Sequence, residues 1–232
     1  MPDHRQVKAV IIVPAFNESA TIKEVLTSLP KRLKGIKKLE IIVVDDGSVD
    51  NTYEIAKEIK INLLHHIINR GLGAAIKTGM VWAKKHHADV AVTFDSDGQH
   101  NSKDIQRIID ALFEKKADLV IGSRFLKFQK VPIDRLILNW IANLSTFFLT
   151  GSLTTDSQSG LRAFSKKAIN LIDIKSDRME FSSEIILEAK KHNLKIAEVP
   201  IQAIYTPYSR SKGQKNLNAI PVFTRFIIRL LR

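Results

Sequence analysis

A regular alternation of two segment types over the first 125 residues limits the fold more than any other feature of this chain. Each unit begins with a short apolar run rich in β-branched residues, passes through a turn rich in Asp, Asn or Gly, and ends in a segment with helical spacing. Strands that alternate with helices need crossover connections, so the pattern predicts an α/β fold with a mostly parallel central sheet flanked by helices. The expected strands are residues 9–13, 39–44, 61–68, 90–94 and 119–121, and the expected helices are residues 21–33, 52–59, 73–85 and 102–115.

The pattern changes after residue 125, but no repeat or low-complexity segment separates a second domain. Pro200 restricts the last expected strand to an edge or a bulge of the sheet. Residues 205–232 contain six basic side chains and no acidic one. We therefore expect one domain over residues 1–217, followed by a basic amphipathic helix over residues 218–232 that could contact a membrane. The expected elements before that helix are a long helix with a wide apolar face at 136–149, a helix at 181–191 and a strand at 196–204.

The composition excludes several kinds of site. The chain has no cysteine, which excludes a disulfide framework, a thiolate metal site and a cysteine nucleophile. Its formal net charge of +12 predicts a surface that attracts polyanions, such as nucleic acid, phosphorylated substrates or an anionic bilayer. The longest apolar run, residues 136–149, contains two asparagines and is too short to span a bilayer, and the N-terminus is too polar for a signal peptide. We expect a cytoplasmic protein.

Polar clusters follow three of the expected strands, at the edge where an open parallel sheet binds its ligands. Asp95 and Asp97 come directly after an apolar strand, so both can turn toward one hard divalent cation, with Gln99 as a neutral oxygen ligand. Arg124 ends the fifth strand at the same edge, which would place a guanidinium near that cation. The three clusters are residues 14–18, 45–48 and 95–99.

Other interpretations of these polar motifs can be judged on their spacing. Asp50 and Asn51 are best explained as turn and helix-cap residues. The Gly-Leu-Gly string at 71–73 is no dinucleotide fingerprint, because its third glycine position is Ile76, and a helix start explains it better. A calcium loop at 95–106 is excluded because Gln106 stands where the closing Glu is needed. A nucleophile elbow and a Walker A motif are both absent from the sequence.

Six strings carry a family resemblance. They are residues 13–18 (VPAFNE), 44–48 (VDDGS), 69–73 (NRGLG), 95–100 (DSDGQH), 122–124 (GSR) and 155–162 (TDSQSGLR). Together they resemble family-2 glycosyltransferases of the GT-A fold, and among these the polyprenyl-phosphate sugar synthases of the dolichyl-phosphate mannose synthase type. The first two strings occur across the superfamily, whereas the fourth and sixth together are more specific to the polyprenyl-phosphate branch. The resemblance extends from about residue 8 to about residue 217.

The resemblance implies a nucleotide-sugar donor and a divalent cation, Mg²⁺ or Mn²⁺, held by Asp97 and Gln99. GDP-mannose is the leading donor, and UDP-glucose or another UDP-sugar is the alternative. The implied donor-binding residues are Pro14, Phe16, Glu18, Val44 and Asp46 around the base and ribose, and Asp95, Ser96, Asp97 and Gln99 around the sugar and diphosphate.

The acceptor implied by the resemblance is a polyprenyl or dolichyl phosphate. A phosphate monoester, with a second pKa near ~6, is already anionic at neutral pH and needs no general base. It would attack the anomeric carbon directly and invert its configuration, while arginines position it. The implied catalytic residues are Asp97, Arg124 and Asp156, and the implied acceptor or phosphate contacts are Arg124, Ser159, Arg210 and Lys215.

Two alternatives remain at this point. A transferase that acts on a glycan hydroxyl would need a carboxylate base, and Asp156 could be that base or a group that orients neighbouring cations. In the basic loop that contains Lys212 and Lys215, the position of the lysine that the resemblance implies also stays open. A nucleic-acid-binding module is suggested only by the net charge and is disfavoured, because acidic residues crowd the expected ligand edge.

Two segments have the composition of helices at a membrane interface. The first, residues 136–149, contains Trp140, and the second is an apolar stripe over residues 222–231 that is interrupted by Arg225 and Arg229. Both could instead pack on the sheet or form an oligomer contact. We expect the protein to associate peripherally with the cytoplasmic face of an anionic membrane.

Overall fold

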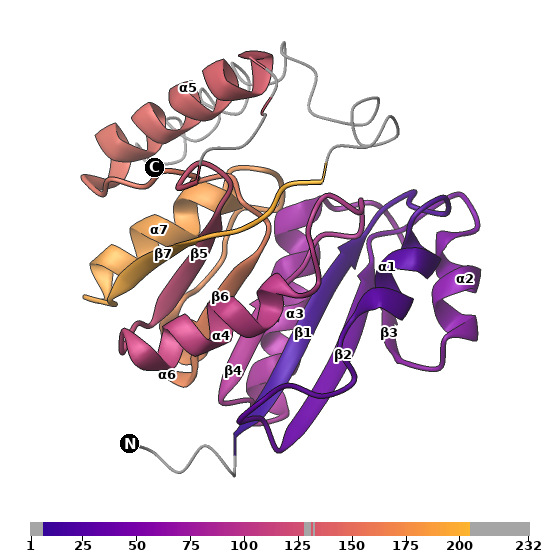
Figure 1. Ribbon diagram of the computed structural model, residues 1–232. Helices are drawn as coiled ribbons and strands as arrows, with labels where there is room; N and C mark the ends of the chain where they lie inside the picture. Colours follow the sequence, from indigo (N-terminus) through magenta and orange to yellow (C-terminus); the bar gives the residue numbers. More distant parts are fainter. Residues whose placement is uncertain (1–6, 128–130, 132, 205–232) are drawn as a thin grey trace.

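The computed structural model describes residues 7–127, 131 and 133–204, without the side chain of residue 134 (Figure 1). Its centre is a seven-stranded sheet with strand order β3-β2-β1-β4-β6-β5-β7. All neighbouring strands are parallel except β6, which runs antiparallel to both β4 and β5. The strands are β1 (Lys8–Ala15), β2 (Lys38–Asp45), β3 (Asn62–His65), β4 (Val90–Thr93), β5 (Leu119–Ser123), β6 (Arg162–Ser165) and β7 (Ile196–Pro200).

Helices cover both faces of the sheet, and alternate residues of β1 point to opposite cores. Ile11 and Val13 pack in a cluster with α1 and α4, whereas Val10 and Ile12 pack in a second cluster with α3, α6 and α7. This arrangement explains why β1 is apolar almost throughout, since both faces of the strand are buried. The helices are α1 (Ile22–Ser28), α2 (Thr52–Glu58), α3 (Leu72–Lys85), α4 (Asp104–Glu114), α5 (Ile133–Thr150), α6 (Lys166–Leu171) and α7 (Phe181–Lys191).

The structure confirms the expected fold class and corrects several boundaries. Helix α1 ends at Ser28 instead of residue 33, because Leu29 takes an extended conformation (ψ 141°) before Pro30. The last expected strand ends at Pro200 instead of residue 204, and β7 is indeed an edge strand. Two elements, β6 and α6, were not predicted at all. Strand β6 has four residues and starts with an arginine, so it lacks the apolar run that marks a buried strand.

Helix α5 lies at the end of the molecule toward which β1 points, apart from the sheet (Figure 1). It packs against α7, and Thr146 of α5 shares a hydrogen bond of 2.8 Å with the Ser183 hydroxyl of α7. Within residues 7–127, 131 and 133–204, we found no helix long and apolar enough to span a bilayer. The expected terminal helix at 218–232, the second apolar stripe and the boundary at residue 217 lie outside the described residues.

Candidate active site

The polar clusters after β1 and β4 meet at the carboxyl edge of the sheet, where the sequence placed them. The Ser96 hydroxyl donates to the carbonyl oxygen of Pro14 at 2.7 Å, which ties the end of β1 to the loop after β4. The Thr21 hydroxyl donates to the carbonyl oxygen of Ser96 at 2.8 Å and to Oε2 of Glu18 at 3.0 Å. The hydroxyl of Thr21 therefore holds Glu18 close to the acidic loop after β4.

Asp95 and Asp97 form an acidic pair in the loop after β4. Burial raises the pKa of Asp97, and the negative charge of Asp95 raises it further. Burial also works against ionisation of Asp95. The positive charges and hydrogen bonding of His100, Arg124 and Arg162 nevertheless keep the pKa of Asp95 below its ordinary value. Nε2 of His100 lies 3.3 Å from Oδ2 of Asp95. The site therefore holds one ionised carboxylate beside another whose charge is disfavoured until a cation approaches.

The donor set of this pair fits a hard divalent cation. Asp95, Asp97 and Gln99 offer two carboxylates and one carboxamide oxygen, which are oxygen donors of the kind that Mg²⁺ and Mn²⁺ take. The Gln99 side-chain amide donates to Oδ2 of Asp97 at 2.5 Å, and its backbone N–H donates to Oδ1 at 3.0 Å. Gln99 would therefore have to turn its carbonyl oxygen toward a cation that it binds. In the described part of the chain, no three His, Asp or Glu side chains are grouped as a complete metal cage.

The loop that contains Gly160 closes against this acidic pair. A Cβ at Gly160 would lie closer than 3.0 Å to all three carboxyl atoms of Asp95. The carbonyl oxygen of Gly160 accepts a hydrogen bond of 2.7 Å from the Thr93 hydroxyl of β4. Glycine is thus the residue that allows the loop and Asp95 to share this space.

The second acidic cluster, at the end of β2, is bonded internally. The carboxylate of Asp46 accepts hydrogen bonds from Nδ1 of His66 (2.7 Å), Nδ2 of Asn69 (3.0 Å) and the backbone N–H groups of Arg70 (3.1 Å) and Gly71 (2.6 Å). Asp46 thereby fixes the turn at 69–71, and both of its carboxylate oxygens are occupied.

Of the other residues expected around the base and ribose, Pro14 lies at the end of β1, Phe16 and Glu18 follow that strand, and Val44 lies in β2. His65 and His66 lack metal-ligand spacing in the sequence, and each is bonded to one of the two adjacent aspartates, His65 to Asp45 at 2.7 Å. The side chain of Val44 is fully buried in the core beside α3, so it does not line the surface of the site. The ring of Phe16 is partly exposed and is available for contact with a ligand.

The 71–73 string starts a helix, as its sequence predicted. Gly71 is the N-cap of α3, with a φ of 116° that favours glycine. The backbone N–H of Ala74, in the first turn of α3, donates to the carbonyl oxygen of Asp177 at 3.1 Å. That contact partly covers the N-terminus of α3, which agrees with the exclusion of a dinucleotide loop there.

Arg124 and Asp156 form a bidentate ion pair. Nε and an Nη of Arg124 donate to the two carboxylate oxygens of Asp156 at 2.7 and 2.8 Å, and the backbone N–H of Arg124 adds a third bond of 3.1 Å. Asp156 is fully buried, whereas the Arg124 side chain is 20% exposed. Of the two roles left open for Asp156, this geometry matches a group that orients a cation.

A second arginine, the last residue of the 155–162 string, lies below the same loop and had no predicted role. Arg162 is completely buried and donates to the carbonyl oxygens of Ser157 (2.6 Å), Ser159 (2.9 Å) and Ser182 (3.1 Å). Burial lowers the pKa of Arg162 to about 10, although the negative charges of Asp156 and Asp95 oppose that shift. Arg162 thus holds the 157–159 backbone in shape. A charged residue at the start of an otherwise uncharged strand is the signal that could have found it.

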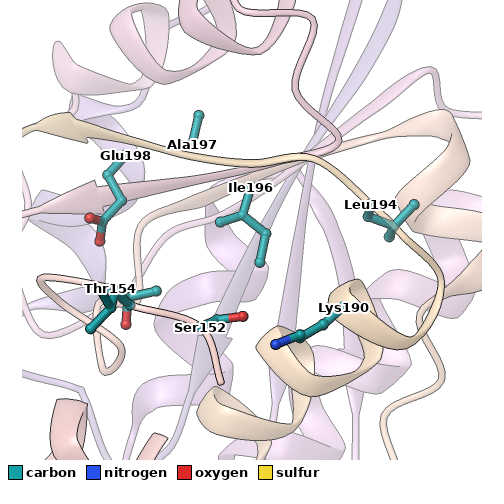
Figure 2. A pocket seen from close by; sticks show the side chains of 8 residues that line it. Ser152, Thr154, Lys190, Leu194, Ile196, Ala197 and Glu198 are labelled. Carbon is teal, nitrogen blue, oxygen red and sulfur yellow. The ribbon is translucent and has the colours of Figure 1, made fainter. Parts of the chain in front are cut away.

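The rest of the loop is held by the edge strand. Glu198 of β7 accepts hydrogen bonds from the backbone N–H (2.8 Å) and the hydroxyl (3.1 Å) of Thr155. A cavity of about 430 Å³ lies beside Glu198, with Thr154 and Lys190 on its wall (Figure 2). The cavity is lined by none of the residues that the sequence assigned to the site.

Two of the expected phosphate contacts can be placed and two cannot. Arg124 is at the site edge, and the hydroxyl oxygen of Ser159 is buried without a hydrogen-bond partner among the described residues. Arg210 and Lys215 lie outside the described residues, as does Lys212.

Comparison with known proteins agrees with this geometry. Residues 10–172 match the family described as Glycosyl transferase family 2. The chain belongs to this family. Its fold is the GT-A fold, and the protein is a glycosyltransferase, as the resemblance of the six strings implied.

Several relatives of this family 2 glycosyltransferase match over most of its length. An uncharacterised protein of Methanocaldococcus jannaschii is 44% identical and covers 94% of this chain and 90% of its own length. The UDP-N-acetylglucosamine–dolichyl-phosphate N-acetylglucosaminyltransferase of Methanococcus voltae is 38% identical, with 94% of each chain covered. The polyprenol monophosphomannose synthase of Mycolicibacterium smegmatis is 30% identical and covers 84% of this chain and 76% of its own.

Among solved structures, the glycosyltransferase resembles glucosyl-3-phosphoglycerate synthase from Mycobacterium tuberculosis in complex with Mn²⁺, UDP and glucosyl-3-phosphoglycerate. That match has a TM-score of 0.69 at 18% identity and covers 97% of this chain and 79% of the other. At this identity the match supports the fold alone.

Proposed function

We propose that this glycosyltransferase moves a sugar from a nucleotide-sugar to a polyprenyl or dolichyl phosphate, with inversion at the anomeric carbon and with a divalent cation. The observation that carries the proposal is the state of Asp156. It is buried, and both of its oxygens already accept hydrogen bonds from Arg124. A carboxylate in that state is a poor proton acceptor, so the site suits an acceptor that arrives already ionised.

The residues on the acceptor side would position an anion without removing a proton from it. Arg124 is held in one orientation by Asp156, and its partly exposed guanidinium can face a phosphate. Arg210 and Lys215 are proposed as further phosphate contacts on the strength of the family resemblance. Arg162, buried below the loop, would keep the loop that carries Asp156 in the shape that aims Arg124.

On the donor side, the acidic pair would receive the cation. A divalent cation bound by Asp97, with Asp95 and Gln99 beside it, would stabilise the negative charge that builds up on the departing nucleoside diphosphate. The raised pKa of Asp97 supports this role, because a positive charge there would relieve the repulsion from Asp95. The synthase of similar fold forms a complex with Mn²⁺ and UDP, so this fold can hold such a cation together with a nucleoside diphosphate.

We propose that the donor nucleoside lies between Phe16, Glu18 and the turn at 69–71. Because the oxygens of Asp46 are occupied by that turn, its contribution would be to shape the pocket. The donor itself is open between two classes. The relative at 30% identity is a monophosphomannose synthase by name, which supports mannose as the sugar, whereas the name of the relative at 38% identity gives UDP-N-acetylglucosamine as the donor.

We also propose that α5 faces the membrane that contains the acceptor. Its residues Ile133, Ile137, Trp140, Leu144 and Phe148 follow helical spacing and form one face, and all five are exposed, Phe148 by 76%. Packing of this face within the core, one of the alternatives for this helix, does not occur among the described residues. A face of this composition on a chain with a net charge of +12 suits the surface of an anionic bilayer.

A donor screen tests the proposed function. The protein would be incubated with a short-chain polyprenyl phosphate and, in turn, GDP-mannose, UDP-N-acetylglucosamine and UDP-glucose, with Mn²⁺, with Mg²⁺ and with excess chelator. We expect one donor to give a lipid-linked sugar that is lost in chelator and restored by added metal.

A matched acceptor arm separates the alternative. A free oligosaccharide replaces the polyprenyl phosphate under the same conditions. Transfer to the oligosaccharide but not to the lipid phosphate would refute the proposed acceptor, and undiminished transfer in chelator would refute the cation.

A further inference from the structure

Helix α5 turns its polar side chains toward the protein and its apolar side chains away from it. Asn139, Asn143, Thr146 and Thr150 recur at intervals of four, three and four residues, and each forms a hydrogen bond on the inner side of the helix or within its last turns. This distribution is the reverse of an ordinary surface helix, in which the apolar face packs on the protein. Specific polar contacts therefore take part in the attachment of α5 to the domain.

The two asparagines bond the backbone of the loop that contains Asp156. Nδ2 of Asn139 and Nδ2 of Asn143 donate to the same carbonyl oxygen, that of Thr155, at 2.9 and 2.8 Å. Oδ1 of Asn143 accepts a hydrogen bond of 2.8 Å from the backbone N–H of Ser157. The backbone groups on both sides of Asp156 are thus fixed to α5.

The same loop has independent attachments on its other sides. Glu198 holds the backbone N–H of Thr155, and Arg162 holds the carbonyl oxygen of Ser157. If the asparagine contacts are removed, the loop stays attached to β7 and to the buried arginine but loses its link to α5. The expected consequence is a shift of Asp156 and with it of Arg124, without loss of the fold.

We propose that Asn139 and Asn143 are positioning residues for the transfer reaction, which set the Arg124–Asp156 pair relative to α5. This inference rests on the proposed function, in which the outer face of α5 meets the lipid phase and Arg124 binds the acceptor phosphate. The inner face of α5 would then hold Arg124 at a fixed distance from the lipid phase. A lipid-linked phosphate reaches the enzyme at a depth set by the bilayer, so the arginine must be held at a matching position.

The test compares Asn139→Ala, Asn143→Ala and the double variant with Ser145→Ala. Ser145 lies on the same helix, and within the described part of the chain its hydroxyl bonds only to the carbonyl oxygen of Ile141 in that helix. We expect kcat with a polyprenyl phosphate to fall about 10- to 100-fold in the double variant, since a displacement of about 1 Å can cost that much. The KM for the donor should stay within a factor of about two, because neither asparagine contacts the acidic pair in the structure.

Hydrogen exchange supplies a readout that does not depend on activity. The backbone N–H of Ser157 should exchange faster in the Asn143→Ala variant than in the wild-type protein, while Ser145→Ala leaves it unchanged. Unchanged exchange and unchanged kcat would overturn the inference. A loss of kcat matched by an equal loss in folded protein would also overturn it, because the asparagines would then act on stability alone.

The two proposals can fail separately. A wild-type protein with no transfer to any polyprenyl phosphate refutes the proposed function, and the screen would then identify the acceptor with which the variants are assayed. Normal wild-type transfer together with normal transfer by the double variant refutes only the role of the asparagines.

Discussion

Replacing Gly160 with alanine is the sharpest test of the acidic pair, because the change adds one methyl group at a known place. The new Cβ would lie closer than 3.0 Å to Cγ, Oδ1 and Oδ2 of Asp95, whereas carbon atoms in contact normally stay about 3.5–4.0 Å apart. The carboxylate of Asp95, or the loop itself, must therefore move by roughly 1 Å or more. We expect kcat to fall about 100-fold, in line with the cost of such a displacement at a reacting centre, and the midpoint for activation by Mn²⁺ to rise.

The assay measures initial rates of transfer over a titration of Mn²⁺, with Gln158→Ala as the control. Gln158 lies two residues earlier in the same loop, and its substitution adds no atom beside Asp95. The Gly160→Ala variant should remain folded, because relief requires only the movement of one side chain or of a short loop at the edge of the sheet. A Gly160→Ala enzyme with the wild-type kcat and the wild-type Mn²⁺ midpoint would refute the idea that the position of Asp95 matters for transfer.

Five further outcomes are expected. Asp97→Ala should abolish transfer, and chelation of the wild-type enzyme should remove activity reversibly, as measured by lipid-linked product. Asp156→Asn should keep measurable transfer to a polyprenyl phosphate, reduced about 10- to 100-fold by the loosened Arg124; complete loss with a normal fold by circular dichroism would instead point to a catalytic base. Burial of Asp50 opposes its ionisation, but hydrogen bonds from Thr52 and Ser19 outweigh burial and lower its pKa to about 2. The ionised carboxylate should therefore stabilise the fold above pH 4, and this stabilisation should disappear as the pH falls through 2. The free energies of unfolding of the wild-type and Asp50→Asn proteins should converge at that pH. Trp140→Gln should weaken sedimentation with anionic vesicles, and equal binding by both proteins would contradict the proposed membrane face.

The centre of the sheet could be predicted because β1, β4 and β5 are buried on both faces and therefore appear as apolar runs. Strand β6 could not, because its place between β4 and β5 depends on a long-range antiparallel pairing that leaves no local pattern. Arg162, the first residue of β6, was not predicted as a core residue for the same reason. Its charge is tolerated in the core because it bonds three carbonyl oxygens and interacts with the carboxylates of Asp156 and Asp95. Ser157, Ser159 and Asp156 belong to the same string as Arg162, but Ser182 and Asp95 come from distant parts of the chain, and the string alone does not show that they meet.

The acidic loop after β4 could be located from sequence for a related reason: two acids that follow an apolar strand are costly without a partner, wherever the rest of the chain lies. The partners of Asp46 gave no comparable signal. His66, Asn69 and the 70–71 backbone reach it only because β2 and β3 run side by side and end together. The sequence therefore identifies which groups need a partner better than it identifies the partner.

The orientation of helix α5 is the feature that is hardest to predict from the sequence. Helical spacing separates an apolar face from a polar one, but the spacing is the same whether the apolar face meets the protein core or an external lipid phase. In this chain the two asparagines decide which face meets the protein, because an amide side chain in an apolar helix needs a hydrogen-bond partner, and the nearby loop supplies backbone groups for both. Once the polar face is committed to the protein, the apolar face is left outside. The residues that argued against a membrane-spanning helix at 136–149 are thus the ones that leave its apolar face outside, where we propose the membrane contact.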